Sequence, residues 1–374
     1  MRRIEDCVLI QEQSLSISLK ERMNPQGMVV TLMILVMLLS TTGCAKQDTM
    51  QGRIQDYQER LERVLDTEFP ELDVGDPAIR YSLPKNLRRS TSAFTINWLD
   101  FFSIMHCDLN RLVGQRNSSL GKVMSASQRW RYEQEFLVVG QQCLEMLQKE
   151  ERKPDLQKQL AEVLRVKSLE MVDIAWNATW AGPEFQQLMS FHDGPLPTDF
   201  RYADWSELTA ALGLLVEGSE HPTRMENSSE PEEMNLKLVS YPVVGRLLLS
   251  VRQATLQIEN INQGLRQVMS RRPVCFNQTP NPKARILSNV LTNIFIVKVQ
   301  PYLAELNKGM EQWRPMLKRS YSALEGNEDN AFYQAYLADH TLMRSFKQSL
   351  TEHGILWTEL LAQCGLSPGN PPSP

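Results

Sequence analysis

The stretch LKLVSYPVVGRLLLSVRQATLQIENINQGLRQVMSR, residues 236–271, decides the fold class of this chain. Its apolar side chains recur at steps of three and four residues with polar ones between, which is the period of an amphipathic α-helix. The pattern predicts a helix of more than thirty residues, from about Leu236 to Arg271. Helices this long with apolar faces predict an elongated bundle.

The same helical period recurs on both sides of this stretch. Further helices are expected at about 54–69, 92–113, 130–147, 154–176, 286–319 and 330–364. Pro301 and Pro315 are candidate kinks, and a turn at 193–197 breaks the shorter helices of residues 183–218. Because no stretch shows several alternating strands with hairpin turns, the predicted fold class is all-α.

The acidic segment 217–233 contains no aliphatic or aromatic residue, so its composition predicts a loop that cannot order itself by burial. We therefore expect a mobile loop at 219–235 between an N-terminal helical region, 53–218, and a C-terminal helical region, 236–366. Residues 367–374 are rich in proline and are expected to form a disordered tail.

The apolar run Met28–Leu39, followed by Ser-Thr-Thr-Gly-Cys44, is typical of a bacterial lipoprotein export signal. Twelve residues are too few to cross a bilayer as a helix, which needs about 20. Cleavage after Gly43 would remove residues 1–43 and leave Cys44 to carry a diacylglyceryl group, with 44–52 as a tether. The alternatives are a buried helix that ends at a glycine cap and an uncleaved membrane anchor.

Composition limits the possible classes of protein. Apolar residues make up 42% of the chain, an ordinary value for a globular protein, which argues against disorder and against a polytopic membrane protein. The net charge of −4 gives no support for nucleic-acid binding.

Two residues near Cys44 bear on the export signal. Thr41 stands where lipoprotein signals usually carry leucine. Ala45, in place of aspartate, favours the periplasmic face of the outer membrane.

Four cysteines follow Cys44, and an even number in an exported protein suggests two disulfides. We favour Cys275 with Cys364, which leaves Cys107 with Cys143. A simple hairpin that turns near residue 119 would separate the second pair by roughly 18 Å along the helices, so that bond requires a broken path. Four buried free thiols are the alternative.

A polar turn precedes the helix that contains Trp130. Its residues are Arg116, Asn117, Ser118, Ser119 and Lys122. Ser119-Leu-Gly-Lys122 matches the Ser-x-x-Lys pattern of penicillin-binding enzymes, but the Lys-Thr-Gly strand motif of those enzymes is missing. Alternatively, Ser118 or Ser119 accepts a backbone N–H bond and caps a helix.

The cluster Arg129-Trp-Arg-Tyr132 suits either stacking on a sugar or a nucleobase, or a helix whose tryptophan enters the core while the arginines cover its edge. The histidines show no zinc-ligand spacing. We expect no metal, no cofactor and no catalytic residue.

The segments Arg116–Met124 (RNSSLGKVM) and Tyr132–Phe136 (YEQEF) resemble a family of bacterial predicted lipoproteins, domain of unknown function 3080. The resemblance extends from about Tyr57 to Cys364. It implies an exported, lipid-anchored envelope protein and carries over no catalytic residue.

The leading functional hypothesis is a helical protein that is tethered to the membrane through a lipid on Cys44 and binds another protein of the cell envelope as a scaffold. An envelope hydrolase that acts through Ser119 and Lys122 is the first alternative. The second is a carrier of apolar ligands, since long helices can enclose a cavity.

Overall fold

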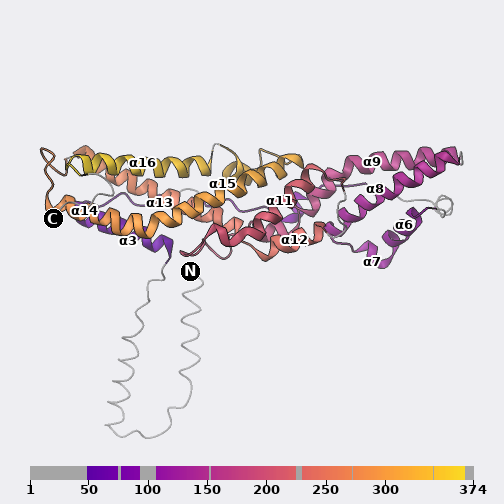
Figure 1. The fold of residues 1–374 in the computed structure, drawn as a ribbon, viewed down its shortest axis with the longest axis horizontal. Coiled ribbons are helices and arrows are strands. Elements are labelled where there is room, and N and C mark those ends of the chain that lie inside the picture. The colour runs from indigo at the N-terminus through magenta and orange to yellow at the C-terminus, as the bar shows by residue number, and fades with distance from the viewer. Residues whose placement is uncertain are drawn as a thin grey trace, which may run out of the picture. The chain divides into compact units, whose positions relative to one another are not determined.

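Helices account for nearly all the regular structure of the computed structural model, which describes residues 49–74, 77–92, 107–150, 153–224, 230–271, 273–339 and 341–366 (Figure 1). The longer helices are α3 (Met50–Leu65), α8 (Ala126–Lys149), α9 (Pro154–Ala178), α11 (Ser206–Glu220), α13 (Val244–Arg271), α15 (Gln300–Ala323) and α16 (Leu342–Ala362). The shorter ones are α4 (Pro84–Leu87), α6 (Leu109–Asn117), α7 (Ser119–Lys122), α10 (Pro183–Leu188), α12 (Glu230–Ser240), α14 (Pro282–Val290), η1 (Tyr202–Trp205), η2 (Leu291–Val299) and η3 (Tyr333–Leu337). These ranges contain no strand, which confirms the all-α fold class.

The single helix predicted over 236–271 is two helices. α12 ends at Ser240 and α13 begins at Val244, with Pro242 in the break between them. Proline has no backbone N–H to donate and its ring clashes with the preceding turn, so a helix interior does not accommodate it well.

The loop predicted over 219–235 was wrong at both of its ends. α11 continues to Glu220, and α12 already begins at Glu230. Met234 and Leu238 on α12 are 2% and 0% exposed. The composition of the acidic segment 217–233 concealed the start of α12, because the helix begins within the segment whereas its buried residues Met234 and Leu238 lie beyond it.

The C-terminal helices also differ from the expected ones. Residues 282–323 form one helical run in which the π-helix η2 lies between α14 and α15. Pro301 stands directly after the π-helical turns, where a wider turn accommodates a residue that cannot donate to the carbonyl four positions earlier. The helix predicted over 330–364 is interrupted, because η3 ends at Leu337 and α16 begins at Leu342.

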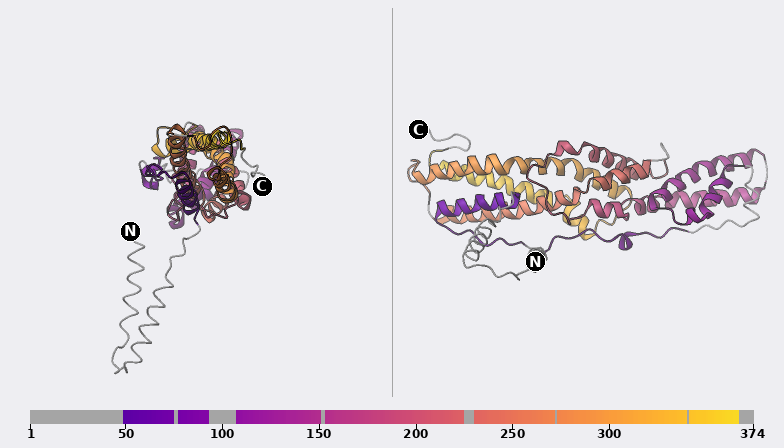
Figure 2. Two further views of the ribbon diagram at one scale, coloured as in Figure 1. Left: turned by 90° about the vertical axis from the view of Figure 1, so that its left-hand side faces the viewer. Right: turned by 90° about the horizontal axis from the view of Figure 1, so that it is seen from below.

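Buried apolar side chains form a large main core and a smaller hairpin core. The main core lies among α3, the C-terminal part of α9, α10–α13, η2, α15 and α16, and contains the buried rings of Trp180, Trp313 and Trp357. The hairpin core lies between α6 and the antiparallel pair α8 and α9. Its buried residues are Leu109, Leu112, Val113, Tyr132, Phe136, Cys143, Leu144, Leu147, Leu160 and Leu164. Figure 2 shows the long helices running alongside one another.

The acidic segment does not separate two cores. Leu212 on α11 and Leu247 on α13 come from either side of it, and both are buried in the main core. The smaller core lies instead within the N-terminal helical region. None of the helices in the described ranges is long and apolar enough to cross a membrane.

Candidate functional site

Both predicted disulfides are present. Cys275 and Cys364 are bonded with their Cα atoms 5.0 Å apart, which ties the segment after α13 to the end of α16. Cys107 and Cys143 are bonded with their Cα atoms 5.6 Å apart. The path between the second pair is broken as its geometry requires, because α6 ends at Asn117 and a separate short helix, α7, precedes α8.

Gly43 and Cys44, the predicted cleavage and lipid-attachment residues, lie outside the described residues. The export signal therefore stays a prediction from the sequence.

The polar turn is a helix cap. The Ser118 hydroxyl accepts a hydrogen bond from the Gly121 N–H at 3.0 Å and donates to the carbonyl of Gln115 at 2.7 Å. The Arg116 guanidinium donates to the Gly121 carbonyl. A Cβ atom at position 121 would lie 2.1 Å from the Gln115 carbonyl oxygen, so only glycine fits there.

The Ser-x-x-Lys pattern is not assembled into a nucleophile and base. Ser119 and Lys122 are both exposed, and no hydrogen bond joins them or links either side chain to another described residue. A nucleophilic serine requires a base within hydrogen-bond reach. The turn instead presents Leu120 and Val123 to solvent, 81% and 76% exposed.

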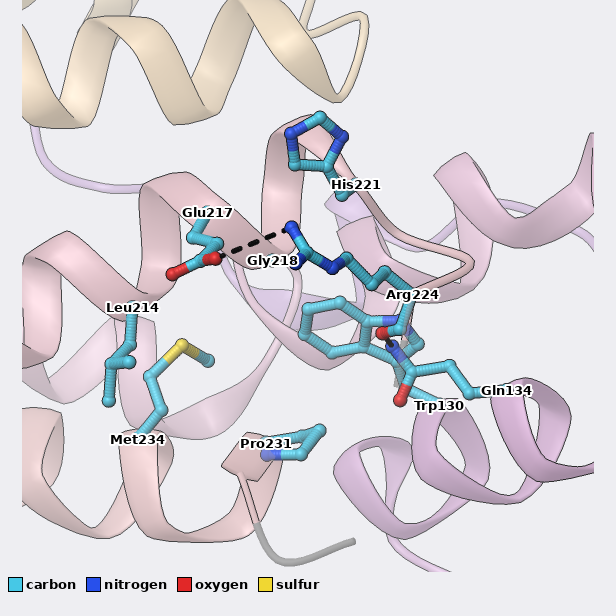
Figure 3. Close-up of a pocket in the computed structure, with 9 residues that line it drawn as sticks. All are labelled: Trp130, Gln134, Leu214, Glu217, Gly218, His221, Arg224, Pro231 and Met234. Carbon is cyan, nitrogen blue, oxygen red and sulfur yellow. Dashed lines mark hydrogen bonds and ion pairs between the residues drawn. The ribbon is translucent and has the colours of Figure 1, made fainter. Parts of the chain in front are cut away.

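A pocket opens beside α8, where that helix meets α11 and α12 (Figure 3). Its lining residues are Trp130, Gln134, Leu214, Glu217, Gly218, His221, Arg224, Pro231 and Met234. We call it the Trp130 pocket. These residues come from three separate segments of the chain, and only the Arg129–Tyr132 cluster marked the place in the sequence.

Trp130 and Gln134 hold the backbone that follows α11. The Trp130 indole N–H donates to the Pro222 carbonyl at 2.9 Å, and the Gln134 amide donates to the carbonyls of Pro222 and Arg224 at 3.1 and 2.8 Å. Gly218 allows this approach, since a Cβ atom there would lie 2.8 Å from the Trp130 ring. The interpretation in which the tryptophan is buried is confirmed, because Trp130 is only 2% exposed.

The rim of the Trp130 pocket carries charge, but its interior is small. Arg224 extends toward Glu217, with 3.8 Å between the charged atoms (Figure 3). The cavity volume is about 40 Å³, which holds only about two or three water molecules. A pocket of this size accommodates a single small group and not an acyl chain.

A buried ion pair lies one helical turn from Trp130. Glu133 on α8 is 1% exposed, and its carboxylate accepts from Lys167 on α9 and from Arg129 at 3.0 Å. The Lys167 ammonium also lies 4.7 Å from the centre of the Phe136 ring. The buried carboxylate thus has two cationic partners, and its pair with Lys167 joins α8 to α9 beside the hairpin core.

The main core holds a neutral polar network around His353. The Asn262 amide donates to the Ser349 carbonyl, so its oxygen faces His353 Nδ1 at 2.7 Å and places the proton there. His353 Nε2 then accepts from the Tyr57 hydroxyl at 3.0 Å, and that hydroxyl accepts from the Trp357 N–H at 2.7 Å. Burial lowers the pKa of His353 to about 3. The imidazole is therefore neutral and satisfied, with a structural role.

No group of three or more histidine, cysteine or carboxylate side chains in the described ranges is placed to hold a metal ion. Two buried side-chain oxygens there lack a hydrogen-bond partner, Glu232 Oε2 and Asn235 Oδ1, both on α12.

These observations define the protein as an all-α helical bundle that is stapled by two disulfides and carries a small pocket at the junction of α8, α11 and α12. A family model matches residues 54–368, and the chain belongs to that family, described as Protein of unknown function (DUF3080). No curated protein and no solved structure matches the chain.

Proposed function

We propose that this protein is a lipid-anchored component of the bacterial cell envelope, held at the periplasmic face of the outer membrane, whose helical body binds another envelope protein. The cysteine inventory carries the proposal. The chain has six cysteines, and four of them are consumed in the two disulfides. Cleavage after Gly43 would remove Cys7 and leave Cys44 as the only free thiol of the mature chain.

The disulfides support export independently of the signal. Disulfides form and persist in oxidising compartments such as the bacterial periplasm and are rare in the cytosol. They close segments of 36 and 89 residues, so they constrain much of the described unit.

The form of the helical body supports binding to a partner over catalysis. The Trp130 pocket has room for a few waters only, and no hydrogen bond joins the side chains of Ser119 and Lys122. The surface is instead made of long helix faces, such as those of α9 and α16, which suit contact with another protein.

Mass spectrometry of the protein purified from membranes of the producing bacterium tests the anchor. We expect the mature chain to begin at Cys44 and to carry the added mass of a diacylglyceryl group, and a Cys44→Ser variant to leave the membrane fraction. A Cys7→Ser variant is the matched control and should behave like the native chain. Recovery of the intact chain with residues 1–43 still attached and no lipid would refute the anchor.

Crosslinking in living cells tests the binding role. The native chain and the Cys44→Ser variant are compared for the set of envelope proteins that they capture. Capture of one defined partner by both forms supports binding by the helical body. A chain that captures no partner in either form contradicts the scaffold role.

A further inference from the structure

The turn at α7 carries the two most exposed large apolar side chains of the described residues. Leu120 is 81% exposed and Val123 is 76% exposed, and Lys122 stands between them. We call these three residues the α7 tip. Leu120 and Val123 are three residues apart and both project into water. Any apolar environment that covers them lowers the free energy of the system.

The α7 tip is held in a fixed conformation. Ser118 caps α7 by accepting from the Gly121 N–H, and Arg116 bonds to the Gly121 carbonyl. Gly121 itself is buried against the end of α6. The Cys107–Cys143 disulfide then ties the start of the α6 segment to α8. The exposure of Leu120 and Val123 thus belongs to a structure with several local constraints.

The charge around the α7 tip is basic. Residues 109–132 contain five basic residues and no acidic one, although the chain as a whole has a net charge of −4. Arg111, Arg129 and Arg131 pair with glutamates on other turns or helices. The side chain of Lys122 forms no hydrogen bond or ion pair within the described ranges, so its charge is available to an anionic surface.

The helix α7 lies on the same side of the bundle as the N-terminal end of α3 (Figure 1). Only five residues lie between Cys44 and Met50, where α3 begins, and an extended chain over these six steps spans about 20 Å. A lipid on Cys44 would therefore bring this side of the bundle close to the membrane.

The size of the tip indicates which surface it fits. A stable protein interface covers about 800 Å² on each partner, which two side chains cannot supply. A bilayer needs less, because an anchored chain is already concentrated at the surface and a weak second contact suffices. The positive charge of Lys122 is attracted to anionic lipid headgroups, because each lysine or arginine near an anionic membrane surface strengthens binding to it.

We propose that the α7 tip is a second membrane contact, in which Leu120 and Val123 enter the headgroup region while Lys122 binds lipid phosphate. This contact rests on the proposed anchoring at Cys44. It would hold the bundle along the membrane instead of letting it swing on its tether.

A site-specific dye tests the contact. The mature chain with Cys44→Ser has no free thiol, so Val123→Cys accepts a polarity-sensitive dye at one place. A histidine tag at the N-terminus then tethers it to vesicles of phosphatidylethanolamine, phosphatidylglycerol and a nickel-chelating lipid. We expect a blue shift of the dye and quenching by brominated lipid. Leu169→Cys on α9, where leucine is 67% exposed, is the matched control and should show neither.

The tethering tag separates this inference from the anchor itself, whose lipid is tested by mass spectrometry. Without a tag, Leu120→Asp combined with Val123→Asp should weaken vesicle partitioning at least tenfold, because burial of one such side chain is already worth about that factor. A dye at position 123 that remains as exposed to water as one at 169 overturns the proposal. So does a dye that shifts only when an envelope protein is added.

Discussion

The hairpin core and the main core are stabilised by different means. The main core is large and aromatic, with Trp176, Trp180 and Tyr321 in mutual ring contact, and its buried polar network is neutral. The hairpin core has ten buried residues, a disulfide across it and a buried ion pair beside it. A small core buries little apolar surface, so covalent and ionic links make up the difference. The comparison predicts that the two regions fail under different perturbations.

Loss of the Cys107–Cys143 disulfide should give the largest effect on the hairpin core. In the chain-entropy model, a bond that closes 36 residues stabilises by about 4 kcal/mol. We expect the free energy of unfolding of the Cys107→Ser/Cys143→Ser variant to fall by roughly that amount. Amide hydrogen exchange should become faster in α6 and in the C-terminal half of α8, which contains Cys143.

The matched control removes the other disulfide. The Cys275→Ser/Cys364→Ser variant should lose a similar free energy of unfolding. Its amide hydrogen exchange in α6 and in the C-terminal half of α8 should nevertheless match that of the native chain. If both variants speed exchange throughout the molecule equally, the two cores are not independent and the comparison fails.

Removal of one partner from the buried ion pair should be the next largest effect. Lys167→Met leaves the Glu133 carboxylate with Arg129 as its remaining partner, and breaking a buried pair typically costs about 3 kcal/mol. Urea denaturation measures the loss. The double variant Lys167→Met/Glu133→Leu should recover most of it, since no charge is then buried.

The exposed pair on α9 provides the control. Arg165 and Glu162 are bonded at 2.6 Å but stand about 60% exposed, and Arg165→Met should cause no measurable loss. Equal losses for Lys167→Met and Arg165→Met would show that burial does not set the value of these pairs.

The neutral network of the main core predicts a dependence on pH. The pKa of His353 falls from 6.5 to about 3 on folding, so between these values the unfolded chain binds a proton that the folded chain does not. Stability is therefore full above pH 6.5 and declines as the pH falls toward 3. At pH 4.5 the loss from this residue is about 2 to 3 kcal/mol.

The variant His353→Gln tests whether protonation of His353 causes this loss of stability at low pH. Its free energy of unfolding should be lower than native at pH 7, because glutamine does not reproduce the contacts with Tyr57 and Asn262. Its decline between pH 6.5 and 4.5 should be smaller than that of the native chain by about the same 2 to 3 kcal/mol. An unchanged decline would assign the acid sensitivity to other groups.

The helical period identified most elements because each long helix covers one core with a repeated apolar face. α3 and α9 illustrate this, with buried residues at the positions that the pattern marks, although α3 ends at Leu65 and Phe69 packs back from the following loop. The pattern failed at breaks. The period predicted one continuous helix over 236–271, although Pro242 interrupts it. Composition, in contrast, predicted a loop for residues 230–235, which are helical.

Sequence patterns could indicate the disulfides and the helix cap, but they could not predict the Trp130 pocket. The even cysteine count suggested two disulfides and favoured Cys275 with Cys364 without excluding other pairings, and a cap is a local pattern around Ser118. The pocket requires the approach of Gly218 to the Trp130 ring from 88 residues away in the sequence. Nothing in the spacing of either segment specifies that approach.

The smallest predicted effect compares two caps that sit next to each other in the chain. Ser118 caps the four-residue α7, and Ser125 caps α8 in a reciprocal pair with Gln128. Substitution of a capping serine by alanine typically costs about 1 kcal/mol. Because α8 carries the hairpin core, Ser125→Ala should lower the global free energy of unfolding by about that amount. Ser118→Ala should instead free only the amide of Gly121, which exchanges faster while global stability changes little. A global loss for Ser118→Ala as large as that for Ser125→Ala would show that the α7 tip folds together with the hairpin core and is not an independent turn on its surface.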